Sequence, residues 1–345
     1  MGRSVGLRVF LVVLALLAVV TGAGLWLLWA PPEPASPAGP AGQAVTVVVP
    51  EGVSISKIGD ILERQRLVRS SLAFRVLARL EGRSIQAGTY QVEPGSDLSA
   101  VLDVFTAGPT PGPTFTVTIP EGLTVEQTLE RIAGAEGSPF TADQLREALA
   151  DVEVPAWVPV TDLPAHAQRL EGLLFPNTYE FRLDASPQEV LSRLVSQTDH
   201  VLRATAIQDS GLSPYEVLIL ASLVEREARL PEERPRISAV IHNRLAEGLR
   251  LQIDATVLYA LGEQKDRVLD ADLEVDSLWN TYRNAGLPPT PIAGMGEASI
   301  RAAAQPSGED SLYYVVDPQT GRHRFSRTYA EHQQAIAEIR RRQTS

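Results

Sequence analysis

One segment in the middle of the chain constrains the fold more than any other. Residues 213–230 read SPYEVLILASLVEREARL, and Ser213, Pro214 and Glu216 have the spacing of a helix capping box with proline in the first turn. Residues 217–224 are apolar or small on every side of the predicted helix. A helix without a polar face is stable in water only when other elements surround it. We therefore expect this helix at the centre of a domain.

The same helix carries two carboxylates, Glu225 and Glu227, at its end. Consecutive helical positions differ by about 100°, so these side chains lie about 200° apart and cannot both face one cleft. Glu227 lies over more aliphatic neighbours and nearer the negative end of the helix dipole, and both effects raise the pKa of a carboxyl group. A raised pKa suits a general acid that works near neutral pH. The pattern favours Glu227 as a catalytic acid and keeps Glu225 as the alternative, although charges at a helix end also often lie in solvent.

Polar side chains follow in two further segments. In residues 249–256, LRLQIDAT, three polar residues alternate at period two, which predicts one face of an extended segment. Residues 240–245, VIHNRL, are backed by apolar positions, and a lone His242 in such a place is expected to be structural. This arrangement suits a ligand rich in hydroxyl and amide groups, although a solvated strand has the same pattern. The candidate binding residues are Gln252, Asp254, Thr256, Asn243, Arg244 and Tyr282.

Composition excludes several classes of function. The 345 residues include 31 Lys and Arg against 42 Asp and Glu, with a net charge of −11 and no cysteine. An acidic chain without a basic block is a poor partner for nucleic acid. The absence of cysteine removes disulfides and thiolate chemistry, and the five histidines lack H-E-x-x-H spacing, so no metal or other cofactor is expected. Glycine-rich phosphate loops and G-x-S-x-G elbows do not occur.

The N-terminus predicts a single-pass membrane anchor. Residues 9–30 are a run of 22 uncharged, mostly apolar residues, which as a helix would cross a ~30 Å hydrocarbon core. Arg3 and Arg8 lie in the short tail 1–8, so the positive-inside rule places the N-terminus in the cytoplasm and the rest of the chain outside. A cleaved signal peptide is the alternative, but its apolar region is usually shorter. Residues 31–44, rich in proline, alanine and glycine, predict an extended tether.

Two similar segments organise the rest of the chain. VVVPEGVS at 47–54 and VTIPEGLT at 117–124 each combine a β-branched run, a Pro-Glu-Gly turn and a helix cap. The first segment opens a predicted β-α-α-β unit over residues 45–108, and GPTPGP at 108–113 marks a boundary. Helices and short strands then mix without regular alternation over residues 114–345. The predicted fold class is therefore α+β rather than a doubly wound sheet.

Several motifs in a fixed order resemble those of one family. They are SLVERE (222–227), IHNRL (241–245), LQIDAT (251–256), NTY (280–282), GLPPTPI (286–292) and HRFSRTYAEH (323–332). Together with LLFPNTYEF and the N-terminal apolar run, they make the chain resemble the endolytic murein transglycosylases of the YceG-like (MltG) family. The resemblance covers nearly all of residues 45–340. It implies that the first unit is a LysM-like subdomain and that residues 114–345 form the catalytic domain.

The resemblance also implies a reaction. The family cuts the β-1,4 bond after N-acetylmuramic acid within nascent peptidoglycan strands and leaves a 1,6-anhydro end, which makes it a lyase. A single glutamate suffices, because it protonates the leaving oxygen and then takes the proton of the sugar's own C6 hydroxyl. The family's catalytic position corresponds to Glu227, again with Glu225 as the alternative. The implied partners are glycan strands, the cell membrane and cell-wall synthases.

Two other functions remain open at this point. One is a non-catalytic peptidoglycan-binding scaffold, although a scaffold has no reason to keep a costly buried acid. The other is a muramidase-type hydrolase that uses Glu227 with Asp254, since hydrolytic glycosidases usually need a second carboxylate. The chain departs from the family's usual pattern at residues 253–256 (IDAT), 290–292 (TPI) and 294–296 (GMG), which affects the loops around the expected groove.

Overall fold

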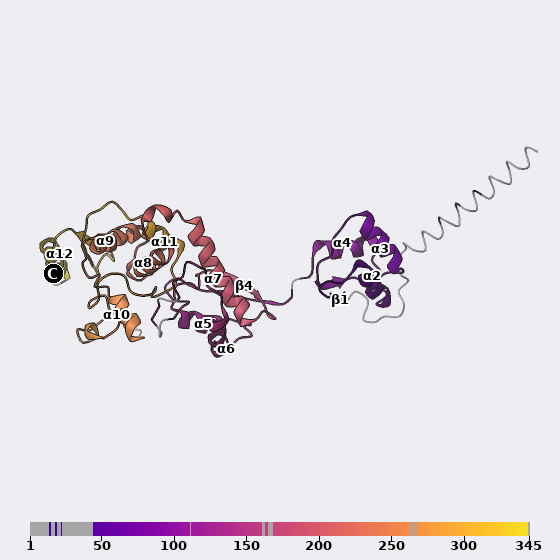
Figure 1. Ribbon diagram of the computed structural model, residues 1–345, viewed down its shortest axis with the longest axis horizontal. Helices are drawn as coiled ribbons and strands as arrows, with labels where there is room; N and C mark the ends of the chain where they lie inside the picture. The colour runs from indigo at the N-terminus through magenta and orange to yellow at the C-terminus, as the bar shows by residue number, and fades with distance from the viewer. Residues whose placement is uncertain are drawn as a thin grey trace, which may run out of the picture. The chain divides into compact units, whose positions relative to one another are not determined.

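The computed structural model describes residues 44–345 apart from positions 111, 161–162, 165–167, 263–264, 266–267 and 344–345, together with the isolated positions 14, 18 and 22. The chain divides into two compact units, residues 1–113 and 114–345 (Figure 1). The anchor predicted for residues 9–30, with its tail and most of its tether, lies outside the described residues. Within the described parts, no helix has the length and apolar character needed to cross a membrane.

The first unit has a β-α-α-β order followed by one more helix, as the sequence predicts. Its strands pair antiparallel, with Val47 opposite Tyr90. Ser54, Ser70 and Asp97 cap the three helices by accepting backbone N–H groups. The elements are β1 (Val45–Val49), α2 (Ile55–Arg64), α3 (Ser71–Leu80), β2 (Gly88–Val92) and α4 (Leu98–Ala107).

This first unit has a hydrophobic core of its own. Val47 and Val49 alternate toward the buried side of β1, as a strand with one covered face requires. The rings of Tyr90 and Phe105 lie 4.4 Å apart, and Phe74 of α3 meets Phe105 edge-on at 6.1 Å. A separate sheet, separate helix caps and a separate core are the features of a unit that can fold alone.

The second unit combines helices with two small antiparallel sheets, β3 with β4 and β5 with β6. This mixture confirms the α+β fold class. Its strands are β3 (Thr114–Thr118), β4 (Thr178–Arg182), β5 (Tyr313–Val316) and β6 (His323–Ser326). Its α-helices are α5 (Val125–Ala133), α6 (Ala142–Ala148), α7 (Pro187–Ala204), α8 (Pro214–Glu227), α9 (Arg234–Ala246), α10 (Asp254–Leu261), α11 (Glu297–Ala304) and α12 (Tyr329–Gln343). Single 3₁₀ turns occur at η1 (Leu149–Asp151), η2 (Gln208–Ser210), η3 (Pro231–Glu233) and η4 (Asp272–Glu274).

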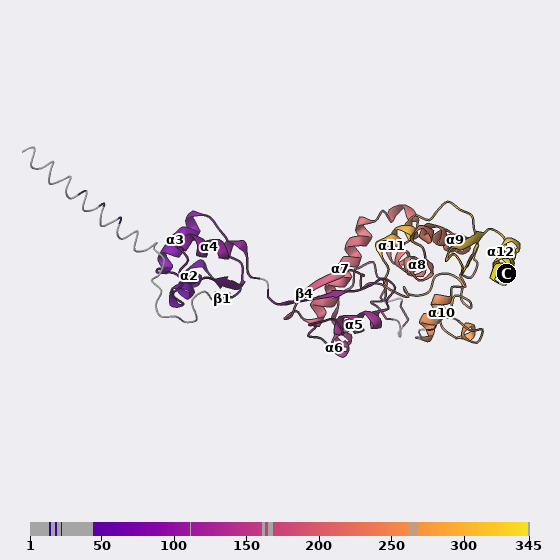
Figure 2. The same cartoon turned by 180° about the vertical axis from the view of Figure 1, so that it is seen from behind.

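Helix α8 lies at the centre of the second unit, as its apolar sequence predicts. Tyr215 and residues 217–224 are all buried. The helix packs against α9, α10 and α11, which surround it in both views (Figures 1 and 2). The predicted capping box is present, with the Ser213 hydroxyl accepting from the Glu216 amide and the Glu216 carboxylate accepting from the Ser213 amide. The middle of the helix is therefore fixed by packing on every side, up to Val224.

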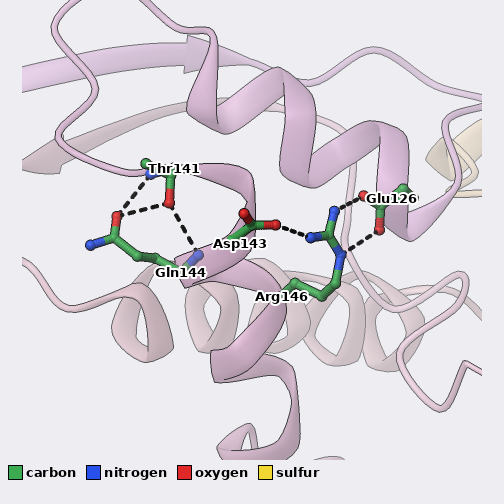
Figure 3. A network of polar contacts seen from close by, with 5 residues as sticks. All are labelled: Glu126, Thr141, Asp143, Gln144 and Arg146. Carbon is green, nitrogen blue, oxygen red and sulfur yellow. Dashed lines mark hydrogen bonds and ion pairs between the residues drawn. The ribbon is translucent and has the colours of Figure 1, made fainter.

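Helices α5 and α6 show how local capping and surface charge combine (Figure 3). The Gln144 amide donates to the Thr141 hydroxyl at 3.2 Å, and the Thr141 amide donates to the Gln144 side chain at 2.9 Å. Arg146 then pairs with Asp143 of its own helix and with Glu126 of α5 (Figure 3). These charged groups are largely exposed, so the pairs contribute little stability compared with the apolar core.

The extended segment predicted for residues 249–256 is wrong. Helix α10 begins at Asp254, and Gln252 has a left-handed backbone with φ of 55°. Gln252, Asp254 and Thr256 therefore do not share one face of a strand. Long-range hydrogen bonds impose the turn, because the Gln252 amide donates to the carbonyl of Thr281 at 3.2 Å and the next amide donates to the Thr281 hydroxyl at 3.0 Å. These tertiary bonds override the alternating pattern of the sequence.

Candidate active site

A cavity of about 540 Å³ lies at the C-terminal end of α8. The turn before α10 and the β5–β6 hairpin form its other walls. Five of the residues singled out in the sequence line it, namely Glu227, Gln252, Asp254, Arg244 and Tyr282. Asn243 and Thr256 are not among the lining residues. The structure thus brings together most of the predicted site and leaves two of its members behind the cavity wall.

Glu227 has the properties of a general acid. The hydroxyl of Tyr314 donates to its Oε2 at 2.9 Å. Burial raises the pKa of Glu227 to about 7, and the negative charge of Asp254 acts in the same direction, while the bond from Tyr314 and the charges of Arg226 and Arg229 oppose the rise. A carboxyl group with a pKa near 7 is about half protonated at neutral pH, so a large fraction of the molecules can deliver a proton to a bound ligand.

Glu225 lies in a different environment, as the helical geometry predicts. Its Oε1 accepts from Arg234 at 3.2 Å, and its Oε2 accepts from the Ser299 hydroxyl at 2.7 Å and the Gly296 amide at 3.1 Å. Arg234 also reaches Glu121 at 3.5 Å. Glu225 does not line the cavity. Its carboxylate instead joins α8 to the starts of α9 and α11.

Asp254 and Tyr282 form a second polar pair in the cavity. The Tyr282 hydroxyl donates to Asp254 Oδ1 at 2.5 Å. Asp254 occupies the first position of α10, where the helix dipole favours a negative charge. Burial and the contact with Asp254 both raise the pKa of Tyr282, so its hydroxyl keeps its proton. With the Tyr282 proton used in this bond, the pair offers acceptor oxygens to a polar ligand.

Arg244 holds two walls of the cavity together. Its Nε donates to the carbonyl of Leu312, and its Nη1 donates to the carbonyl of Leu251, both at 2.8 Å. The same Nη1 reaches the side chain of Gln252 at 3.4 Å, and the guanidinium lies 5.1 Å from the centre of the Tyr313 ring. Arg244 therefore lines the cavity while it fixes the turn before α10 against β5.

Asn243 and Thr256 act as structural residues. Asn243 Nδ2 donates to the carbonyls of Glu309 at 2.9 Å and Ser311 at 3.0 Å, which positions the chain entering β5. The buried Thr256 hydroxyl donates to the carbonyl of Ile253 at 2.6 Å and lies 2.9 Å from the hydroxyl of Thr281. Neither side chain lines the cavity, and Asn243 Nδ2 and the Thr256 hydroxyl are bonded within the protein, so a contact of these residues with a ligand stays a prediction. His242, expected to be structural, bonds the carbonyl of Ala303 at 2.8 Å.

The sequence reasoning missed Tyr314, which bonds Glu227, and the linked pair of His323 and Glu233. Tyr314 has no role assigned from the sequence. His323 packs edge-on against Tyr314 with ring centres 5.4 Å apart, and its Nδ1 lies 2.6 Å from Oε2 of the buried Glu233. The His323 amide also donates to Glu233 at 3.0 Å, which ties β6 to the turn η3. Only the position of His323 in a shared motif pointed to it.

A second buried acid lies beside an adjoining cavity. Glu171 accepts from the amide of Val125 at 3.0 Å and from the hydroxyl of Tyr259 at 3.1 Å, and burial raises its pKa to about 7. It lines a cavity of about 510 Å³. The two cavities share Arg226, Ala255 and Leu258 in their walls. Among the described side chains, no group of His, Asp and Glu is placed to hold a metal ion.

Comparison with known proteins identifies the family. Residues 47–338 match the YceG-like family. The endolytic murein transglycosylase of Bacillus subtilis (strain 168) is 36% identical over 304 residues, which cover 84% of this chain and 83% of the relative. The enzyme of the same name from Streptococcus pneumoniae serotype 2 is 30% identical over 321 residues, covering 85% of this chain and 58% of the longer relative. The crystal structure of the yceG-like protein lmo1499 from Listeria monocytogenes matches with a TM-score of 0.57 and 32% identity, covering 85% of this chain and 99% of that one. The chain therefore belongs to the YceG-like family.

Proposed function

We propose that this protein is an endolytic murein transglycosylase, a lyase of peptidoglycan strands, with Glu227 as its acid–base residue. The observation that carries the proposal is the environment of Glu227. It lies in a cavity walled by polar side chains, with its pKa raised to about 7 and a hydroxyl bonded to its carboxyl group. The relatives named endolytic murein transglycosylase support the reaction class.

One carboxyl group can complete the reaction. Neutral Glu227 gives its proton to the glycosidic oxygen, and the bond from that oxygen to C1 of the muramic acid breaks. The C6 hydroxyl of the same sugar then forms a bond to C1 and passes its proton to the Glu227 carboxylate. The acid is regenerated, no water is consumed, and the product has a 1,6-anhydro end. This sequence needs no second carboxylate to activate water, in contrast to glycoside hydrolysis.

The remaining cavity residues supply binding. Gln252, Asp254 and Tyr282 present amide, carboxylate and hydroxyl groups of the kind that pair with sugar hydroxyls and acetamido groups. The adjoining cavity beside Glu171 gives a strand room to continue past Arg226. Binding on both sides of the cut bond is what cleavage within a strand requires.

We further propose that the protein is anchored in the cytoplasmic membrane by residues 9–30, with its N-terminus in the cytoplasm. The uncharged run of 22 residues and the preceding Arg3 and Arg8 support this topology. Residues 31–44 then act as a tether, and the first unit acts as a LysM-like module that binds glycan strands. This location places the active site beside newly made strands and the synthases that make them.

Analysis of cleavage products tests the reaction. We expect the protein to cut uncrosslinked glycan strands internally and to leave muramyl ends lighter by one water molecule than hydrolytic ends, as read by mass spectrometry. Ordinary reducing ends would instead indicate a muramidase-type hydrolase, for which Asp254 in the same cavity is the available second carboxylate. Strand binding without any cleavage would indicate a scaffold.

The bond from Tyr314 gives a prediction for pH dependence. Its hydroxyl stabilises the charged form of Glu227 and so lowers the pKa of that carboxyl group. Tyr314→Phe removes this bond, and the alkaline limb of the kcat/KM profile should move up by about half to one pH unit. Tyr313→Phe removes a hydroxyl from the neighbouring residue of β5 and should leave the limb in place. An unchanged profile in Tyr314→Phe would contradict the proposed role of Glu227.

A further inference from the structure

Helix α3 of the first unit is apolar on two opposite faces. Phe74 and Leu77 point into the core. On the other side, Leu72, Val76 and Leu80 are 55%, 42% and 76% exposed. Their spacing of four residues places them in one continuous row along the helix. Such a row on a soluble surface calls for an apolar partner.

The surroundings of this row are strongly basic. Residues 64–83 contain six arginines and a single glutamate, in a chain whose net charge is −11. Helical spacing puts Arg75 and Arg79 along the edge of the row. In the part of the chain that the structure describes, neither arginine lies within ion-pair distance of a carboxylate, and Arg75 bonds only the carbonyl of Ser71 in its own helix at 3.3 Å. Their charges are therefore available to an anionic partner.

We propose that this face of α3, formed by Leu72, Val76, Leu80, Arg75 and Arg79, docks on the anionic surface of the lipid bilayer. Aliphatic side chains enter the boundary between headgroups and acyl chains, while guanidinium groups pair with lipid phosphates. A glycan strand is a poorer match, because sugars are bound by aromatic rings and hydrogen-bonding groups rather than by aliphatic rows. A second copy is also a poorer match, because three aliphatic side chains offer on the order of 300 Å², against ~800 Å² per partner in a stable dimer.

The length of the chain before the first unit is consistent with docking on the bilayer. The proposed anchor ends at residue 30, and the 14 residues 31–44 reach at most about 50 Å when fully extended. If residues 9–30 cross the membrane, the first unit stays within that distance of the bilayer. The tether then keeps the effective concentration of α3 at the bilayer surface high, and this favours docking.

Vesicle binding of residues 44–345 tests the proposal without the anchor. Both units are retained, each with its own core. We expect the protein to sediment with vesicles of phosphatidylcholine and phosphatidylglycerol, and much less with phosphatidylcholine alone. Leu72→Ser/Val76→Ser/Leu80→Ser should weaken partitioning at least tenfold, and Arg75→Gln/Arg79→Gln should weaken it and reduce its salt dependence. The matched control Leu269→Ser/Leu278→Ser changes exposed leucines of the second unit and should bind as wild type.

A probe in the full chain gives a second readout. The chain has no cysteine, so Val76→Cys can carry a single environment-sensitive nitrobenzoxadiazole label. Its fluorescence should rise and shift to the blue in nanodiscs with anionic lipid, whereas a label at Leu278→Cys should not respond.

Equal vesicle binding by the triple serine variant and wild type would overturn the proposal, as would equal binding to neutral vesicles. Self-association or glycan binding that the triple change abolishes, without vesicle binding, would assign the face to another occupant. The triple variant should still form 1,6-anhydro ends, because its changes lie outside the second unit that holds Glu227, and this separates the test from that of the active site.

Discussion

Glu227→Gln is expected to lower the rate of strand cleavage about a thousandfold or more while strand binding is retained. Glutamine keeps the shape of the side chain and can still accept the bond from Tyr314, but it has no proton to give to the glycosidic oxygen. Loss of a general acid typically costs a factor of about 10² to 10⁴. The measurement is single-turnover cleavage of defined glycan strands, together with a separate binding assay.

Two controls belong with this variant. Glu225→Gln changes the neighbouring carboxylate, which lies in the Arg234 network, and should keep cleavage within about tenfold of wild type. Full activity in Glu227→Gln with loss in Glu225→Gln would reverse the assignment.

Glu227→Gln should also be folded and more stable than wild type above pH 7. Because the pKa of Glu227 is raised from about 4.3 in the unfolded chain to about 7 in the folded protein, the wild type loses up to ~4 kcal/mol of stability as the pH rises through this range. Glutamine has no such loss.

Arg234→Met is expected to destabilise the second unit by about 3–5 kcal/mol. The side chains of Arg234 and Glu225 are only 13% and 7% exposed, and Arg234 also approaches Glu121. Removing the cation leaves a buried carboxylate beside a second one, whereas methionine fills a similar volume without charge. Urea unfolding monitored by tryptophan fluorescence measures the loss.

Charge removal can be separated from loss of packing. Adding Glu225→Gln to Arg234→Met removes the uncompensated charge and should recover part of the stability. Arg203→Met breaks an ion pair with Asp199 in which the arginine is 74% exposed, so its cost should stay within about 1 kcal/mol. A loss in Arg234→Met as small as that in Arg203→Met would mean that the Glu225 network does not stabilise the fold.

Local signals in the sequence predicted much of this structure. The capping box at Ser213 formed as predicted, because it depends on residues three positions apart. The central place of α8 followed from its lack of a polar face. The divergence of Glu225 and Glu227 needed only the pitch of a helix. Each of these features is decided within a few turns of one element.

Other features depend on contacts between distant segments, and the sequence pattern could not supply them. The turn at Gln252 is held by Thr281, so the alternating residues around it form no strand. Tyr314 reaches Glu227 across 87 positions, and His323 reaches Glu233 across 90. The hydrogen-bonding capacity of Thr256 is used up inside the fold in the same way. Residue type alone does not reveal which polar groups are hydrogen-bonded inside the protein and which remain available to a ligand.

The hairpin that carries Tyr314 and His323 sets an order of assembly. Helix α8 is complete at Glu227, but one wall of the cavity, which includes the hydrogen-bond donor Tyr314, is made of residues that leave the ribosome nearly ninety positions later. Until β5 and β6 arrive, Glu227 lies at an open helix end, where water keeps the pKa of a carboxyl group low. A nascent or truncated chain thus contains Glu227, but the pKa of its carboxyl group is not yet raised. With Glu227 as the proposed acid, we expect the capacity to cut strands to appear only once the last tenth of the polypeptide has folded.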